Sequence, residues 1–155
     1  MMVAFHNPTY PTWYDRLIRL KTNSTYVHTE LLFDEMGVKR PGFYTSFSSV
    51  IDAGSRFQDD MNFLTSEWKL VALPDKWDWQ PIYNFCSGMA HKRYDLLGIL
   101  GFILPWGEHD DSDIFCSEST TDAIQYRHDG ELFPHQKAWM VSPGDLYKLV
   151  TNASH

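Results

Sequence analysis

The order of apolar and polar residues in the first third of the chain predicts one helix followed by two strands. Between Trp13 and Lys21 the apolar residues recur at helical spacing, and Thr12 stands where a helix N-cap belongs. Residues 25–33 (TYVHTELLF) alternate and are rich in β-branched and aromatic side chains, and residues 43–49 (FYTSFSS) follow after a turn that contains glycine and proline. We therefore expect these two segments to be neighbouring antiparallel strands.

The rest of the chain predicts one more strand and then mostly helices. A strand is expected over residues 67–73, where Pro74 ends it. The later elements are a helix over 77–90, a buried helix over Tyr94–Leu104, an acidic loop over 107–113, a helix over 115–126 that opens at Cys116, and a short helix announced by Ser142 and Pro143. This order indicates an α+β fold in which a small antiparallel sheet or half-barrel packs against helices. Without repeats or linker-like stretches, residues 1–155 are expected to form a single domain.

The composition is that of a folded globular protein. Of the 155 residues, 43% are hydrophobic and 21% are charged, which excludes a disordered, collagen-like or coiled-coil chain. Aromatic residues make up 15%, so we expect an aromatic-rich core. The most apolar run, residues 96–106, contains glycine and proline and is much shorter than the roughly 20 residues that span a bilayer.

Charge and cysteine content narrow the expected partners and compartment. The formal net charge of -7 opposes the phosphate neutralisation on which nucleic-acid binding depends, so we expect no nucleic-acid partner. Two cysteines cannot build a disulfide framework, and the first residues lack the basic and apolar regions of a signal peptide. The expected compartment at synthesis is therefore the cytoplasm.

Cys116 is the first candidate for chemistry. It lies where an acidic segment meets the start of a predicted helix, and the unpaired backbone N–H groups of a helix start stabilise a thiolate or receive an oxyanion. The alternative is a small buried side chain that happens to begin a helix. Cys86 lies among Tyr83, Phe85 and Met89, and core packing explains it best.

His28 and Glu30 are the candidates for activating this cysteine. Strand alternation places both side chains on one face, while Val27 and Leu31 take the other face. A histidine can accept the thiol proton, and a neighbouring carboxylate can orient the ring and favour its charged form. The alternative is a polar stripe that faces solvent.

The joint pattern is more specific than either motif alone. His-x-Glu on an early strand precedes Phe-Cys-Ser-Glu at a helix start, with Tyr94-Asp95 between them. In this order the chain resembles the circularly permuted NlpC-type papain-like cysteine peptidases and amidases, particularly the YiiX/YebB-like group, and more distantly the lecithin retinol acyltransferase-like enzymes. The resemblance covers about residues 25–126.

The resemblance implies a permuted papain-like fold and a role for each matched residue. Cys116 would be the nucleophile and His28 the general base, with Tyr94 and Ser117 near the oxyanion or the substrate. In related enzymes the third polar residue often lies on the following strand, where this chain offers the hydroxyls of Thr45, Ser46 and Ser48. This departure favours Glu30 as the orienting residue; the alternatives are a looser dyad of Cys116 and His28, or one of these hydroxyls in the orienting role.

The implied activity is hydrolysis of an amide or ester bond through an acyl-enzyme, without a cofactor. Cell-wall (peptidoglycan) peptides rank ahead of lipid acyl groups as substrates. A wall substrate would require export, association with a virion, or release on lysis. The alternative is a non-catalytic papain-like module for binding or structure, for instance in a phage particle.

Metal binding is the remaining alternative. Residues 108–113 (EHDDSD) are rich in oxygen ligands but lack the glycine and the distal glutamate of an EF-hand loop, so we expect a solvated loop. Cys116, His28 and Glu30 could hold zinc, but no zinc-type spacing supports that site. We therefore expect no metal.

Overall fold

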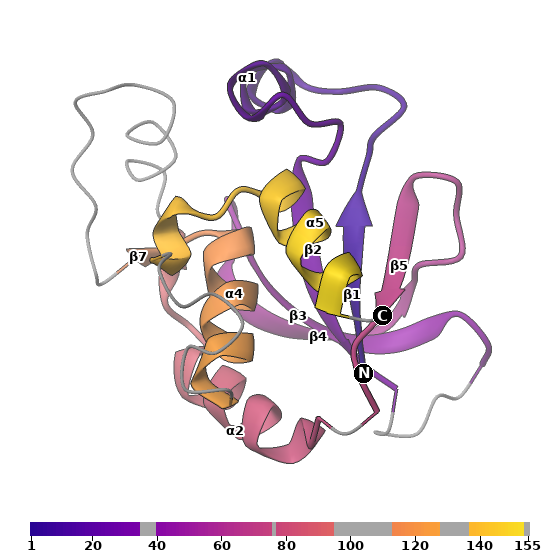
Figure 1. Ribbon diagram of the computed structural model, residues 1–155, viewed down its shortest axis with the longest axis vertical. Coiled ribbons are helices and arrows are strands. Elements are labelled where there is room, and N and C mark those ends of the chain that lie inside the picture. Colours follow the sequence, from indigo (N-terminus) through magenta and orange to yellow (C-terminus); the bar gives the residue numbers. More distant parts are fainter. Residues whose placement is uncertain (35–39, 76, 95–112, 128–136, 154–155) are drawn as a thin grey trace.

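An antiparallel sheet lies at the centre of the molecule. The computed structural model describes residues 1–34, 40–75, 77–94, 113–127 and 137–153. Five strands lie in the order β4-β3-β2-β1-β5, and every neighbouring pair is antiparallel (Figure 1). They are β1 (Met2–His6), β2 (His28–Phe33), β3 (Phe43–Val50), β4 (Gly54–Asn62) and β5 (Trp68–Ala72).

Helices complete the described part of the fold. They are α1 (Trp13–Thr22), α2 (Trp79–Met89), α4 (Cys116–Arg127) and α5 (Pro143–Ala153), with the 3-10 turn η1 (Ala138–Met140) before α5. The two-residue strands β6 (Arg93–Tyr94) and β7 (Asp113–Ile114) form a separate parallel pair. The fold is therefore α+β, with a small antiparallel sheet packed against helices, as the sequence predicts.

The main core lies between the sheet and helices α2, α4 and α5, which cover one of its faces (Figure 1). Along β2, Leu31 and Phe33 enter this core, whereas Leu32 joins a smaller apolar cluster. Phe5 and Phe47 are also fully buried in the main core. The expectation of an aromatic-rich core is confirmed.

Capping residues fix two of the helix starts. Thr12 and Asp15 form a capping box: the Asp15 N–H donates to Thr12 Oγ1 at 3.3 Å, and the Thr12 N–H donates to Asp15 Oδ2 at 2.8 Å. At α5, the Asp145 N–H donates to Ser142 Oγ at 3.1 Å. Both helices therefore begin where the sequence predicts.

Most other predicted elements differ from the structure only at their ends. The segments predicted over 43–49, 67–73, 77–90 and 115–126 correspond to β3, β5, α2 and α4. The strand predicted from residue 25 begins only at His28. Strands β2 and β3 are antiparallel neighbours, as expected.

Two strands of the five-stranded sheet have no counterpart in the sequence prediction. Strand β1 is short and mostly apolar, and it lies inside the sheet between β2 and β5. Strand β4 lies at the sheet edge, where its exposed polar residues hide the alternating pattern. Tyr94, predicted to begin a helix, lies in β6 instead; the remainder of that predicted helix and most of the acidic loop fall outside the described residues.

Gly54 fixes the turn between β3 and β4. Its φ of 66° is in the left-handed region that favours glycine, and a Cβ there would collide with the carbonyl oxygen of Lys92. Two backbone hydrogen bonds connect Ser55, the residue after this glycine, to the chain that follows α2. The Ser55 N–H donates to the Lys92 carbonyl at 2.9 Å, and the His91 N–H donates to the Ser55 carbonyl at 2.7 Å. The turn that precedes β4 is therefore held against the β6 segment.

Within the described ranges, no helix is both long and apolar enough to cross a membrane.

Candidate active site

Cys116 is the first residue of α4, and its side chain is buried, with 4% of the residue exposed. Burial alone would raise the pKa of its thiol. The charge of His28 and a hydrogen bond to that ring lower the pKa instead, helped by the backbone N–H groups of Thr29 and Ser117. The net direction is downward, which favours the thiolate.

The sequence of α4 allows its start to lie deep in the molecule. Its first turns are rich in serine and threonine, and their hydroxyls donate to nearby carbonyls: Ser119 and Thr120 to Cys116, and Thr121 to Ser117. Because these polar groups are satisfied locally, the helix buries them without an unpaired donor. The helix packs directly on β2, where Thr120 Oγ1 lies 3.4 Å from Thr29 Oγ1.

His28 begins β2 and lies between Cys116 and Glu30. Its Nε2 is 3.3 Å from Glu30 Oε1 and 3.4 Å from Ser48 Oγ. Because Ser48 Oγ already donates to the Thr29 carbonyl at 2.7 Å, it accepts from Nε2. The same ring also forms a hydrogen bond with Cys116.

The electrostatic surroundings favour a charged imidazole. Burial would lower the pKa of His28, but the charge and hydrogen bond of Cys116, followed by those of Glu30, raise it to about 10. Above the lowered pKa of Cys116 and below the raised pKa of His28, the resting state is a thiolate-imidazolium pair.

Glu30 is a buried carboxylate, with 3% of the residue exposed. Burial would raise its pKa, but the hydrogen bond and charge of His28 lower it, with support from Ser46 and the Arg56 guanidinium. The side chain is therefore ionised where it contacts the ring. An ionised carboxylate fixes the ring orientation and stabilises its positive charge.

A groove of about 700 Å³ leads past His28. One wall comes from the N-terminal segment, including Asp15 and Ile18 of α1, and the other from the turn between β3 and β4. Tyr94 and Arg56 also line the groove. Its size is within the range typical of ligand-binding clefts.

Cys116 itself borders a much smaller apolar cavity of about 20 Å³, next to this groove. Ile18 and Val27 line both spaces and therefore form the boundary between them. The hydroxyl of Ser117 is not available to the Cys116 thiol or the His28 ring, because it donates to the Val141 carbonyl at 2.7 Å. Only its N–H is directed to the sulfur.

The structure thus brings together Cys116, His28 and Glu30, the three residues that the sequence proposes as catalytic. Tyr94 lies in the groove beside them. Among the hydroxyls that could orient the His28 ring in place of Glu30, Ser48 contacts the ring, whereas Thr45 donates to Asp59 at an exposed position.

Sequence reasoning missed two further residues of the site. His6 is paired with His28 across β1 and β2 and lines the same groove. Burial and then the charge of His28 lower its pKa, so it stays neutral beside the charged ring. Arg56 is paired with Ser48 across β3 and β4. Both could have been found only from the strand register, because neither β1 nor β4 was predicted.

The environment of Cys86 is different. It is fully buried in the core, and burial raises the pKa of its thiol. In the described part of the chain, no group of three or more His, Cys, Asp or Glu side chains is arranged to hold a metal ion. The side chains of residues 108–113 lie outside that part.

No protein-family model matches the chain, and no curated protein matches it either. The function must therefore be inferred from the side chains of the site.

Proposed function

We propose that the protein is a papain-like cysteine hydrolase that cleaves an amide or ester bond through an acyl-enzyme. The observation that carries the proposal is the hydrogen-bonded pair of Cys116 and His28, with Glu30 Oε1 3.3 Å from Nε2 of the same ring. A nucleophile, a base and a group that orients the base are the parts that such catalysis requires. The chain order, histidine strand before cysteine helix, supports the permuted arrangement.

The reaction follows from the charge state of the pair. The Cys116 thiolate attacks the carbonyl carbon, a C–S bond forms, and the carbonyl electron pair moves to the oxygen, which N–H groups at the start of α4 can stabilise. The carbon–nitrogen or carbon–oxygen bond then breaks, and the leaving group takes the proton of the His28 imidazolium. Neutral His28 next removes a proton from water, whose hydroxide displaces the sulfur, so that a carboxylic acid leaves and the pair is restored.

The groove favours a peptide as the substrate. Apolar side chains form part of its lining, but it also carries charged ones, among them Asp52, Arg56 and Glu67. An acyl chain gains nothing from such groups, whereas a peptide can pair with them. We therefore place short peptides, cell-wall peptides among them, ahead of lipid acyl groups.

The test is a search for the covalent intermediate by intact-mass analysis. The protein is incubated with peptidoglycan-derived peptides, activated peptide esters and short-chain acyl esters. We expect an acyl adduct on the wild type and on Cys86→Ala, and none on Cys116→Ala. Because no step uses a metal ion, a chelator leaves the adduct unchanged; loss that zinc restores would contradict the proposal.

One observation favours a second candidate, a non-catalytic module that binds a peptide in the groove. Cys116 is only 4% exposed, and the cavity beside it, about 20 Å³, has room for about one water molecule rather than an acyl group. Under this candidate no adduct forms with any substrate class, although peptides still bind and Cys116 still reacts with a small alkylating reagent.

A further inference from the structure

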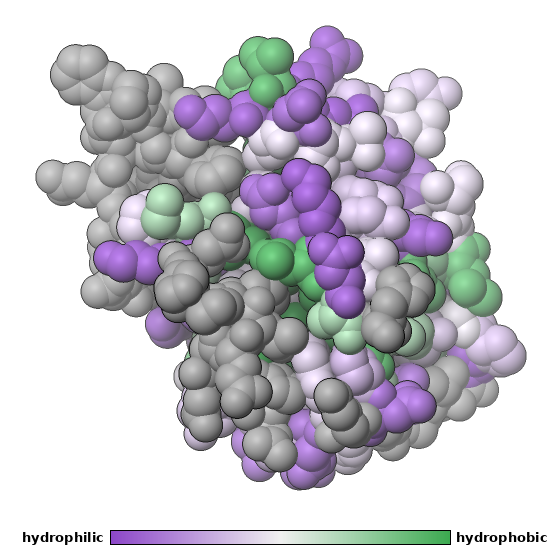
Figure 2. Space-filling view, in the orientation of Figure 1, coloured by the Kyte–Doolittle hydropathy of each residue, from purple (hydrophilic) through white to green (hydrophobic). Residues whose placement is uncertain are grey.

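Helix α1 exposes an apolar stripe to solvent. Trp13 and Leu20 are 71% and 82% exposed, and Leu17 between them is 36% exposed. At 3.6 residues per turn these three side chains share one side of the helix. The opposite side is anchored, since Asp15 and Ile18 are buried. A hydrophobic patch over α1 is visible in Figure 2, with hydrophilic residues beside it.

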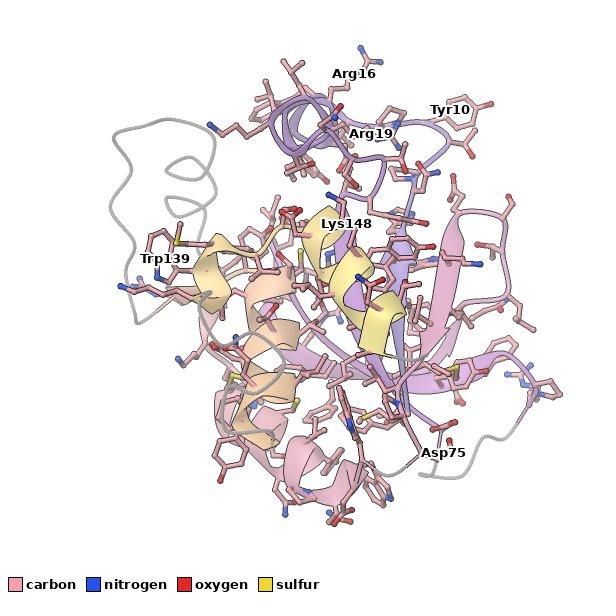
Figure 3. All side chains as sticks on the ribbon, viewed as in Figure 1. Tyr10, Arg16, Arg19, Asp75, Trp139 and Lys148 are labelled. Atoms are coloured by element: carbon pink, nitrogen blue, oxygen red, sulfur yellow. The ribbon has the colours of Figure 1, made fainter. Side chains whose placement is uncertain are left out.

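The charges that border this stripe are basic. Arg16 lies along one edge and Lys21 along the other, and both are exposed. Arg16 points away from the body of the molecule (Figure 3). The one acidic residue of the helix, Asp15, is buried in the capping box with Thr12. The outer face of α1 is therefore positive in a chain whose formal net charge is -7.

We propose that the outer face of α1 docks on an anionic lipid bilayer. Tryptophan and leucine on one side of a helix, flanked by arginine and lysine, are the composition of interfacial helices, whose basic side chains reach the headgroups while their apolar side enters the acyl boundary. The net charge of the chain opposes this contact weakly, because salt screens charges beyond about 8 Å.

A bilayer fits this face better than other occupants. A second copy would bring Arg16 and Lys21 against the same basic residues across a self-complementary contact. A coiled coil needs at least three heptads, and α1 has 10 residues. Its position at the extremity of the molecule suits a flat surface (Figure 1).

Docking would also orient the groove. The buried side of α1 contributes Asp15 and Ile18 to the groove that contains His28. A bilayer on the outer side would therefore lie next to the groove, so substrates held at a membrane surface would come within reach. Only this consequence depends on the proposed hydrolase activity; docking does not.

Flotation of the full chain with vesicles tests the docking. We expect binding to vesicles of phosphatidylcholine with phosphatidylglycerol, and much weaker binding to phosphatidylcholine alone. Arg16→Gln/Lys21→Gln should lower the partition coefficient about tenfold or more, since each basic residue contributes about 1 kcal/mol, or about fivefold. Trp13→Ser/Leu20→Ser should lower it at least as much through lost apolar burial.

Matched variants elsewhere serve as controls. Met140→Ser removes an exposed apolar side chain outside α1, and Lys69→Gln removes an exposed basic one; both should bind like the wild type. Low-pH alkylation of Cys116, unchanged in all variants, shows that each is folded and keeps the site. Docking is contradicted if the wild type does not float, if the α1 and control variants bind alike, or if the stripe instead supports a dimer that the α1 variants abolish.

Discussion

The two cysteines of the chain are both buried, yet the pKa values of their thiols move in opposite directions. Cys86 lies in the apolar core, where burial raises the pKa. Cys116 is also buried, but the His28 charge and the N–H groups of Thr29 and Ser117 outweigh burial and lower it. Specific partners rather than exposure therefore decide which thiol is reactive.

At the scale of single residues, the first prediction concerns alkylation of the two cysteines by iodoacetamide near pH 6. We expect Cys116 to react while Cys86 does not, because an ordinary thiol with a pKa of 9.0 is less than about 1% ionised at that pH. Peptide mapping by mass spectrometry separates the two sites. The pH dependence is the readout, since access to the sulfur is the same at each pH.

Variants of the partner residues sharpen this test. His28→Ala should slow Cys116 about a hundredfold near pH 6, because the thiol returns toward its ordinary pKa. Glu30→Gln should slow it less, by about tenfold, since the amide still accepts a hydrogen bond but carries no charge. Ser48→Ala is the matched control, because Ser48 is the other contact of His28 Nε2. A larger effect there than at Glu30 would mean that Ser48 of β3, rather than Glu30, orients the ring.

Part of the site could be predicted from local sequence alone. Alternation along β2 is sufficient to place His28 beside Glu30, and a helix start is sufficient to mark Cys116. His6 and Arg56 could not be found in this way, because their proximity depends on the register of β1 and β4. Register is set by pairing between distant segments, which a local pattern does not report.

At the scale of elements, burial departs from what periodicity suggests in two helices. In α1 the helical spacing of apolar residues is real, but the stripe of Trp13, Leu17 and Leu20 faces solvent. In α4 the reverse holds: Ser119, Thr120 and other polar residues are fully buried because their hydroxyls are satisfied by nearby carbonyls. The positions of these two helices were predictable from the pattern, whereas their buried faces depended on these contacts.

The element prediction concerns the turn that forms one wall of the groove. Gly54→Ala should lower the free energy of unfolding by about 2 kcal/mol or more, because the left-handed φ is strained for alanine and its Cβ meets the Lys92 carbonyl. Urea unfolding measures the change. Gly88→Ala is the control: it lies in α2 with open space around it and should gain about 0.5–1 kcal/mol. Equal effects at both positions would refute the role given to Gly54.

At the scale of the whole molecule, the Cys116–His28 pair makes the free energy of unfolding depend on pH. Below pH 9.0, and above both the lowered pKa of Cys116 and the ordinary pKa of His28, 6.5, the folded pair and the unfolded residues each hold one proton, so the contribution is constant. Below pH 6.5 unfolded His28 gains its proton, whereas the folded pair takes up its second proton only below the lowered pKa of Cys116. Above 9.0 unfolded Cys116 loses its proton while folded His28 keeps its own until about pH 10. Stability from the pair therefore falls as the pH rises above 9.0.

This prediction is checked by urea unfolding between pH 5 and 10. The difference in unfolding free energy between the wild type and Cys116→Ala should form a plateau and fall away from it by at most about 1.4 kcal/mol per pH unit. The difference is the proper quantity because Cys86, which lies in the core away from the pair, contributes equally to both proteins. Above pH 5 the contribution of Glu30 is nearly constant, since its lowered pKa acts below its ordinary value of 4.5. A flat difference across the whole range would count against the ion pair.

The distance along the chain between His28 and Cys116 has a consequence for biosynthesis. A ribosome makes the histidine strand long before the cysteine, so the nascent chain carries no activated thiol until α4 has been made and has packed on β2. During synthesis Cys116 is therefore an ordinary thiol, which reacts with oxidants and acyl donors more slowly at neutral pH than a thiolate does. In refolding experiments the onset of Cys116 labelling at low pH would time the docking of α4 on the sheet, independently of helix formation itself.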